Sequence, residues 1–251
     1  MGLRIRPLLC GTIRGNKALV NTLGKDVDKW VDNPSIVWYI EGAKERILVD
    51  TGMADEERAN KYHYPGSRRT PDQEPQNALR RIGVRAEDID MVIYTHLHWD
   101  HCHNADKFKN ATFIVHRDEL SFAIAPIPPY YRSYEALAIG LKPPFLEIPF
   151  ETIAKEREVA RGVTVFPTPG HSPGHQSVAV ETDKGVYVIT GDAVFVYENW
   201  EGDPERKMRF WPIGRYYDIG KVWESFERIA EIADFILPGH EMRVFDKEVY
   251  P

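Results

Sequence analysis

The sequence predicts an α/β protein in which two β-sheets pack against each other and helices cover the outside. Three observations lead to this fold class. Short runs rich in β-branched and aromatic residues are typical of strands, these runs fall into two batches along the chain, and segments with helical spacing lie between and around the batches. Because no linker, repeat or low-complexity tract divides the chain, we expect a single domain over residues 1–251.

Nine segments have the composition of strands. The second and third form an expected hairpin, because only residues 43–45 separate them. The third ends at Asp50 and the eighth at Asp192, and each aspartate has a glycine within two residues. Loops at strand ends suit fixed ligands, since the strands hold them rigid. The expected strands lie within residues 3–9, 35–42, 46–52, 90–96, 112–116, 162–169, 176–182, 185–192 and 234–240.

Four segments have the apolar spacing or the terminal glycine of a helix. The expected helices are residues 74–83, 116–125, 132–140 and 218–233. Three long segments, 53–74, 126–145 and 195–218, are rich in aromatic residues, proline and charge but only weakly periodic. Loops of such length in a compact domain tend to carry function.

The composition argues against several classes of protein. The formal net charge of -6 offers no general attraction to nucleic acid. No apolar run approaches the length of a membrane span, and the N-terminus lacks the apolar stretch of a signal peptide, so we expect a cytoplasmic protein without a membrane partner. The two cysteines, Cys10 and Cys102, do not make a disulfide framework, and Cys102 is expected to be a small packing residue.

The stretch THLHWDH, residues 95–101, places four potential metal ligands at the end of an expected strand. An extended backbone would send His96 and His98 to the same side, and a helical start would turn Asp100 and His101 back towards them. Neutral imidazoles suit zinc or another divalent transition ion, and a carboxylate adds charge to the second group. The segment therefore predicts two adjacent metal cages.

Three more candidate ligands follow apolar strands further along the chain. They are His171 in PTPGHSPGH, Asp192 in VITGDAV and His240 in FILPGHE, and each stands next to a glycine. A single loop histidine is more often structural than metal-binding. The number of candidates at strand ends nevertheless favours a metal site here.

In this order, the elements HxHxDH, TPGHSPGH, TGD and PGH resemble those of the metallo-β-lactamase superfamily, and the resemblance extends from LVDTG to LPGHE. It implies an αββα sandwich with a dinuclear metal site at one edge of the two sheets. It also implies that one metal is held by His96, His98 and His171, the other by Asp100, His101 and His240, and that Asp192 bridges them. We expect two divalent ions, preferably zinc, with iron, manganese or cobalt as alternatives.

Two further residues match positions beside the metals of that superfamily. His175 corresponds to the second histidine of GHxPGH, which implies a hydrogen bond to a ligand or to a loop carbonyl. Asp50 either orients a ligand imidazole or caps a turn. We expect no metal role for His63, His103 and His116, although His103 is close enough to line the entrance.

Within the superfamily, HLHWDH and TPGHSPGHQS resemble the N-acyl homoserine lactonase group. The resemblance implies a hydrolase in which a metal-bridging hydroxide attacks the ring carbonyl of a small-molecule lactone. Asp192 would bridge the metals, and Asp100 would carry a proton to the leaving alkoxide. Another ester or thioester hydrolase is an alternative. A diiron redox protein is disfavoured because His98 stands where those relatives carry glutamate, and a non-catalytic binding protein because no ligand is missing.

Two features depart from the lactonase group. CHNAD follows the metal motif in place of small residues and glycines, and Phe195 stands where the lactonases have a tyrosine. Either Tyr197, Tyr216 or Tyr217 supplies the missing hydroxyl, or the substrate is a different lactone or ester.

The aromatic loops offer candidates for the substrate pocket. Arg209 or Arg215 could meet a carboxylate of the substrate. Residues 126–145 are apolar enough for a homodimer interface or for an intramolecular contact. Besides Phe195 and the three tyrosines, the candidate pocket residues are Trp99, Tyr130, Tyr131, Phe145, Trp200, Phe210 and Trp211.

Overall fold

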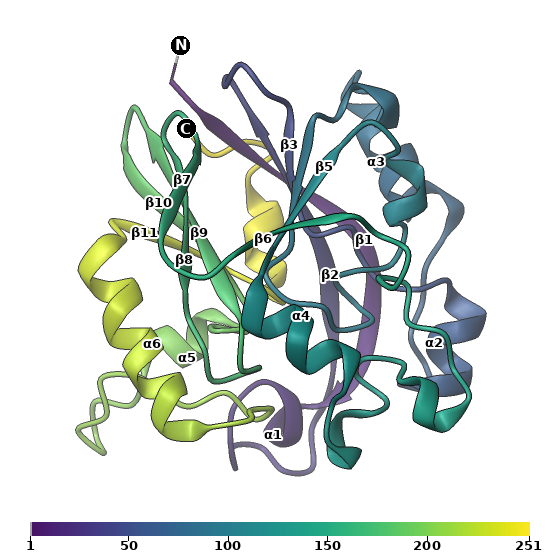
Figure 1. Cartoon of the computed structure of the whole chain (residues 1–251). Helices are drawn as coiled ribbons and strands as arrows, with labels where there is room; N and C mark the ends of the chain where they lie inside the picture. Colours follow the sequence, from purple (N-terminus) through teal and green to yellow (C-terminus); the bar gives the residue numbers. More distant parts are fainter. Residues whose placement is uncertain (1) are drawn as a thin grey trace.

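The computed structural model describes residues 2–251 and has two sheets that pack against each other (Figure 1). The first sheet has six strands, in the order β1-β2-β3-β4-β5-β6, and the second has five, in the order β11-β10-β9-β8-β7. The first sheet contains β1 (Arg4–Asn16), β2 (Trp30–Glu41), β3 (Ile47–Val49), β4 (Met91–Ile93), β5 (Thr112–His116) and β6 (Phe150–Ile153). The second contains β7 (Arg157–Ala160), β8 (Val163–Pro167), β9 (Gln176–Thr182), β10 (Gly185–Gly191) and β11 (Phe235–Pro238).

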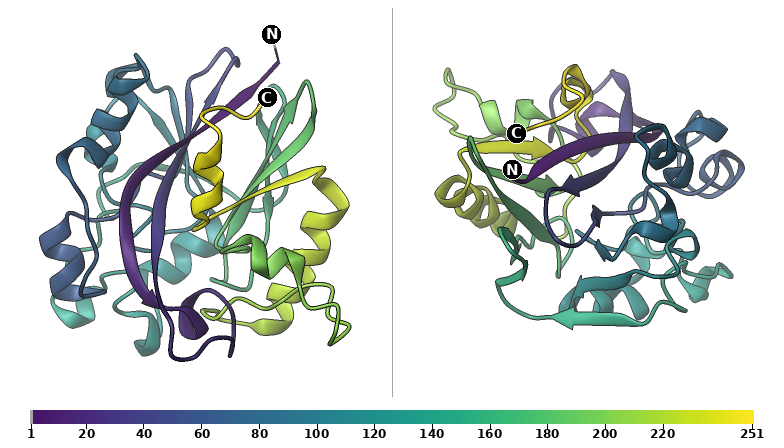
Figure 2. Two further views of the ribbon diagram at one scale, coloured as in Figure 1. Left: turned by 180° about the vertical axis from the view of Figure 1, so that it is seen from behind. Right: turned by 90° about the horizontal axis from the view of Figure 1, so that it is seen from above.

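Helices cover both outer faces of the sheet pair. Helices α3 (Pro75–Arg81) and α4 (Arg117–Ile124) pack on the first sheet, and α6 (Ile219–Ile232) packs on the second (Figure 2). Three shorter helices lie in the connecting segments: α1 (Lys17–Val20), α2 (Glu56–Tyr62) and α5 (Tyr197–Glu201). Short 3₁₀ helices occur at Pro71–Gln73, Ala86–Asp88, Ala105–Lys107, Pro128–Tyr130, Leu137–Ile139 and Met242–Asp246. The predicted α/β class with two packed sheets is therefore confirmed.

The strand β3 shows how the apolar pattern produces these layers. Its three residues are all buried, and successive side chains of a strand point to opposite faces. Ile47 and Val49 face the second sheet, where they join Val165 and Ile189, whereas Leu48 faces α3 and contributes to the cluster around Leu79. A strand buried on both faces needs a continuous apolar run rather than an alternating one, as in RILVD.

Helix α6 has the clearest amphipathic pattern of the chain. The side chain of Asp218 caps its first turn by accepting a hydrogen bond from the backbone nitrogen of Lys221. Val222, Phe226 and Ile229, spaced by four and three residues, form the buried stripe that covers the second sheet. No helix in the described part of the chain is long and apolar enough to cross a bilayer.

Several boundaries differ from the expected ones. β1 continues to Asn16 because its pairing with β2 resumes after an irregularity between Leu9 and Thr12. The strands β6 and β7 were not predicted, since their exposed, charged residues lack a strand pattern. The segments 53–74 and 195–218, expected as loops, contain the short helices α2 and α5.

The helix predicted over residues 132–140 is wrong. Only the 3₁₀ turn Leu137–Ile139 forms there, and Glu135 has a left-handed backbone with φ of 49°. The buried carboxylate of Glu135 accepts hydrogen bonds from Arg58, at 2.7 and 2.8 Å, and lies 2.8 Å from His63 Nε2. These contacts hold Glu135 turned inwards, and they outweigh the helical propensity of the sequence around it.

The two halves of the molecule meet closely at Gly174, in the loop between β8 and β9. A Cβ atom built on Gly174 would lie 1.9 Å from the backbone nitrogen of Glu119 in the first turn of α4. Backbone at that distance cannot rotate away as a side chain can. The close packing of α4 against this loop therefore requires glycine at position 174.

We predict that Gly174→Ala lowers the free energy of unfolding by about 1 to 3 kcal/mol, because the added methyl group forces two backbone segments apart. Urea denaturation measures the change. Gly220→Ala is the matched control, since the nearest neighbour of its Cβ is Asp218 Oδ1 at 3.3 Å and alanine favours the helix. Equal stability of the two variants would contradict the close contact.

Candidate metal centre

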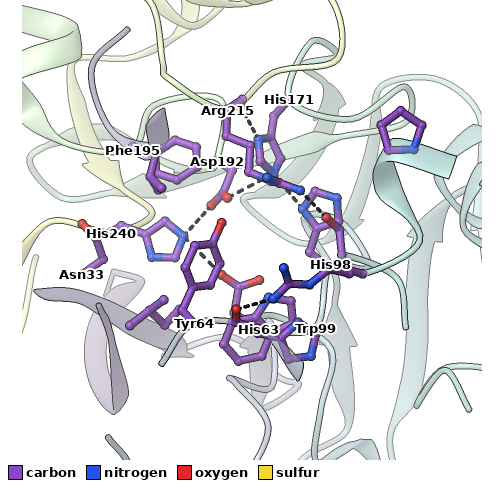
Figure 3. A pocket seen from close by; sticks show the side chains of 16 residues that line it. Asn33, His63, Tyr64, His98, Trp99, His171, Asp192, Phe195, Arg215 and His240 are labelled. Carbon is purple, nitrogen blue, oxygen red and sulfur yellow. Dashed lines mark hydrogen bonds and ion pairs between the residues drawn. The ribbon is translucent and has the colours of Figure 1, made fainter. Parts of the chain in front are cut away.

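The predicted ligands lie at one edge of the sheet pair, where several strands end. β4 leads into the loop with His96, His98, Asp100 and His101, and β10 and β11 end next to Asp192 and His240. His171 follows β8 in the same way. The carboxyl ends of parallel neighbours meet at the same edge of a sheet, and β3 with β4 and β10 with β11 are parallel pairs. The topology therefore brings the distant motifs together (Figure 3).

The seven side chains form three overlapping groups in which the potential ligand atoms lie within 4.8 Å of one another. The groups are His96, His98 and His171; His96, His101 and Asp192; and Asp100, His101 and His240. The carboxylate of Asp192 occupies the middle. Its Oδ2 lies 3.2 Å from His171 Nε2, and its Oδ1 lies 3.2 Å from His101 Nε2 and 3.1 Å from His240 Nε2.

Hydrogen bonds on the far side of three imidazoles determine which nitrogen faces Asp192. Nδ1–H of His171 donates to the carbonyl of Arg215, and Nδ1–H of His240 donates to the carbonyl of Pro34, both at 2.8 Å. Nδ1–H of His101 donates to Asp50 Oδ2, also at 2.8 Å. Because these partners only accept, a neutral imidazole directs the lone pair of Nε2 towards the centre.

The remaining two histidines fit the same pattern. The hydroxyl of Thr95 donates to Asp50, so its oxygen accepts from Nδ1–H of His96 at 3.1 Å. His98 differs because it directs Nδ1, rather than Nε2, towards His171. Its Nδ1 lies 2.9 Å from His171 Nε2. Two nitrogen acceptors at this distance repel each other unless a proton or a cation lies between them.

Unpartnered buried atoms test whether metal ions fit this cluster. His96 Nε2, His98 Nε2, His101 Nε2 and Asp192 Oδ1 are buried and make no hydrogen bond of acceptable geometry, although Asp192 Oδ1 lies close to two imidazole nitrogens. Such groups are costly to bury unless something satisfies them. Five imidazoles and two carboxylates that converge with their lone pairs are the donor set of a divalent transition metal, so the residues fit two such ions.

Burial and mutual proximity shift the pKa values within the cluster in opposite directions. Burial and neighbouring imidazoles lower the pKa of His96 well below its usual value, and burial lowers the pKa of His171 to about 4. Burial also opposes the imidazolium of His101, but Asp192, Asp50 and Asp100 outweigh it and raise the pKa of His101. Protons and metal ions compete for such lone pairs, so metal binding should weaken as the pH falls.

Asp50 and His175 lie directly behind the predicted ligands. Besides His101, Asp50 accepts a hydrogen bond from the backbone nitrogen of Thr95 at 2.8 Å, and burial raises the pKa of its carboxyl group. His175 Nε2 accepts from the backbone nitrogen of Asp192 at 3.0 Å. The two residues thus contact one ligand side chain and one ligand backbone, respectively.

Sequence reasoning missed Glu119, which fastens the loops that carry the predicted ligands. Its buried carboxylate accepts hydrogen bonds from Leu97 N and Tyr134 Oη at 2.9 Å each, and from Ser172 Oγ at 2.5 Å and Gly174 N at 3.3 Å. Leu97 lies between two predicted ligands and Ser172 follows a third. The available signal was weak: Glu119 stands four residues before buried Ala123, on the inner face of α4.

A cavity of about 240 Å³ opens over the cluster, and Asp100, Asp192, His98, His171 and His240 line it. Of the predicted pocket residues, Trp99, Phe195 and Arg215 line it as well. The others that were named, including Arg209, do not. Sequence reasoning missed Tyr64, which lines the cavity, and His63, which lines it and stacks on Trp99 with ring centroids 4.0 Å apart.

The three tyrosines expected to replace the hydroxyl absent at Phe195 lie elsewhere. The hydroxyl of Tyr197 donates to the carbonyl of Ile236, behind the cavity wall. Tyr217 is exposed and packs on Phe122, and Tyr216 also does not reach the cavity. Side-chain direction in a loop depends on packing that the sequence pattern does not display.

The other histidines and Cys102 lie outside the metal groups. His63 and His103 contact Glu135, and His116 caps α4 by accepting from the backbone nitrogen of Asp118. Cys102 is fully buried, which raises the pKa of its thiol well above the usual value.

Comparison with known proteins gives a consistent result. Residues 30–240 match the model of the metallo-beta-lactamase superfamily. The chain is 33% identical over 182 residues to an N-acyl homoserine lactonase from a Bacillus species, and the match covers 69% of each chain.

Solved structures with similar folds cover nearly the whole chain. One is an N-acyl homoserine lactone hydrolase with the product N-hexanoyl-L-homoserine bound at the catalytic metal center, with a TM-score of 0.79, 25% identity and coverage of 98% of this chain and 96% of that chain. Another is a B. thuringiensis variant with N-decanoyl-L-homoserine bound at the active site, with a TM-score of 0.79, 26% identity and the same coverage. The chain therefore belongs to the metallo-β-lactamase superfamily, within which it resembles the N-acyl homoserine lactonase group.

Proposed function

We propose that this protein is a metal-dependent hydrolase that opens a lactone ring, with N-acyl homoserine lactones or related cyclic esters as substrates. The observation that carries the proposal is the convergence of six potential ligands around a seventh, Asp192, beside a cavity. The relatives named above are lactonases, which supports the same reaction class.

The seven residues divide into two sets of three with one shared carboxylate. His96, His98 and His171 would hold one ion; Asp100, His101 and His240 would hold the other; and Asp192 would lie between them. The excess of imidazole over carboxylate favours zinc in both sets. Two divalent ions bound there would supply an activated water near neutral pH and polarise the ester carbonyl.

Asp100 is the ligand placed to handle a proton. Its side chain is 15% exposed, whereas that of Asp192 is 3% exposed, and Asp100 Oδ2 lies 3.8 Å from Nε2 of both His101 and His240. It also lines the cavity. We propose that its carboxylate accepts a proton at this place and delivers it to the leaving oxygen of the ring.

The rest of the cavity wall does not provide an activated serine, threonine or cysteine nucleophile. Ser133 is the serine in the wall, and its Oγ accepts a hydrogen bond from Arg215 rather than pairing with a histidine. Apolar surfaces from Ile13, Trp99 and Phe195 limit the water around the site. This arrangement supports attack by an activated water rather than a covalent mechanism.

We predict that Asp192→Asn lowers lactone hydrolysis by more than about 100-fold and reduces the bound metal, because the amide keeps the shape but removes the shared negative charge. Elemental analysis and a lactone-opening assay on the same sample measure both effects. Asp106→Asn is the matched control, since Asp106 is exposed and pairs with Lys107 only. Full activity of Asp192→Asn would rule out this centre as the active site.

We predict that Asp50→Asn weakens metal binding or activity by about 10- to 100-fold, because the amide no longer holds the Nδ1–H of His101 as a charged acceptor. Asparagine tolerates the left-handed backbone at this position, where φ is 63°. Competition with a chelator measures the affinity.

The control for this prediction is Asp26→Asn, the same substitution at another aspartate with a left-handed backbone, where φ is 54°. Asp26 pairs with Lys17 and Lys29 rather than with a predicted ligand. Equal metal affinity in the two variants would show that Asp50 acts only as a turn residue.

A further inference from the structure

The cavity wall contains one partly buried cation, Arg215, that has no carboxylate partner. Within residues 2–251, its side chain makes a single hydrogen bond, from Nη2 to Ser133 Oγ at 2.5 Å, and no carboxylate oxygen lies within 4.0 Å of it. A guanidinium carries five N–H donors, so most of its donors remain free. A half-buried cation with free donors favours an acceptor from outside the chain.

The other two arginines that could serve the cavity are used differently. Arg132 also lines the cavity, but its N–H groups donate to the backbone carbonyls of Tyr62 and His63 and fasten the wall. Arg209 is exposed, lies over the ring of Phe210 and does not line the cavity. Arg215 is therefore the arginine whose charge is directed at the cavity.

Arg215 lies beside the predicted metal ligands. Its carbonyl accepts the hydrogen bond of His171 Nδ1, and Figure 3 shows its side chain next to His171 and extending towards His98. Phe195, across from it, stacks on His240 at 4.9 Å and has no polar atom to offer. Arg215 is therefore the charged side-chain donor of this wall, beside the neutral donors of Tyr64 and Asn33.

Charge balance favours an anionic group over a neutral one. Asp100 and Asp192 are the carboxylates that line the cavity, and both belong to the groups that would hold metal ions. Their negative charge would thus be matched by the metals, and none would be left for Arg215. An anion that enters the cavity would supply the missing counter-charge at this partly buried guanidinium.

We propose that Arg215 binds a carboxylate that the substrate carries outside the scissile ring, so that the protein prefers lactones with an acidic substituent over neutral ones. The inference rests on the proposed lactonase function. It assigns Arg215 a role in substrate binding, separate from the handling of the proton by Asp100.

A matched pair of substrates tests the preference. One is an N-acyl homoserine lactone whose acyl chain ends in a carboxylate, and the other ends in the primary amide of the same shape. We expect the metal-loaded protein to open the acidic lactone with at least about tenfold higher kcat/KM. In Arg215→Gln, KM for the acidic lactone should rise about 10- to 100-fold with little change in kcat, while the values for the amide stay within about threefold.

Three control variants isolate the charge. Arg215→Lys keeps the cation and should retain part of the preference. Ser133→Ala removes the hydrogen-bond partner of Arg215 without removing its charge and should retain most of it. Arg209→Gln makes the same substitution outside the cavity, and the kinetic constants for both substrates should stay unchanged. The metal content of every variant is measured, and it should not change because the carbonyl that holds His171 remains.

Two kinetic outcomes would overturn the proposal. If Arg215→Gln lowers kcat/KM for both lactones equally, the residue has a structural role. The second outcome concerns inhibition by the ring-opened product of the amide substrate. If Arg215→Gln weakens this inhibition but leaves the preference for the acidic lactone unchanged, Arg215 binds the carboxylate that ring opening creates.

A binding measurement keeps the proposal testable when hydrolysis fails. If the unaltered protein opens neither lactone, the proposed function is wrong, and calorimetry with the two ring-opened acids then decides the role of Arg215. Tighter binding of the acid with the second carboxylate, lost in Arg215→Gln, supports the proposal. Equal binding of the two acids to the unaltered protein overturns it.

Discussion

The architecture of this protein depends on the crowding of imidazole lone pairs around the buried carboxylate of Asp192. Left to themselves, these groups would move apart or take up protons. They stay in place because four of the five imidazoles are hydrogen-bonded on their outer side, to Asp50, to the hydroxyl of Thr95, or to the carbonyls of Pro34 and Arg215. Pro34, Asp50 and Thr95 stand on or close to strands of the first sheet, whereas Arg215 lies in the segment before α6, so the first sheet supplies most of the rigidity that the repulsion at the centre requires.

A second set of contacts holds the loops above the sheets. The carboxylate of Glu119 connects the loop of His96 and His98, the loop of His171 and the segment 126–145 through four hydrogen bonds. The carboxylate of Glu135 connects that segment to α2 through Arg58 and His63. Two buried carboxylates, those of Glu119 and Glu135, therefore connect the loops around the centre. Each is well supplied with donors, as buried carboxylates must be.

The sequence was informative wherever the pattern is local. The spacing in THLHWDH and the glycine-flanked ligands at strand ends identified side chains that the structure places together, because rigid strands leave little freedom to the residues that follow them. The order of apolar runs predicted the two sheets because each run is itself a local pattern.

The failures have a common physical cause, which is contact between residues far apart in the chain. The segment 132–140 has helical spacing, yet Glu135 turns inwards to meet Arg58, 77 residues away. Tyr197 was one of three candidates for the hydroxyl absent at Phe195, but its own hydroxyl donates to the carbonyl of Ile236. Nothing in the residues around Tyr64 indicates that it reaches the cavity, because many separate segments must fold before the cavity exists.

The main chain and the side chain of Arg215 face different surroundings. The main-chain carbonyl steadies His171, and any amino acid provides that carbonyl. The side chain faces the cavity and is not needed for the hydrogen bond to His171. During evolution, Arg215 could therefore be replaced by another residue, which would change the substrate preference while the position of His171 is kept.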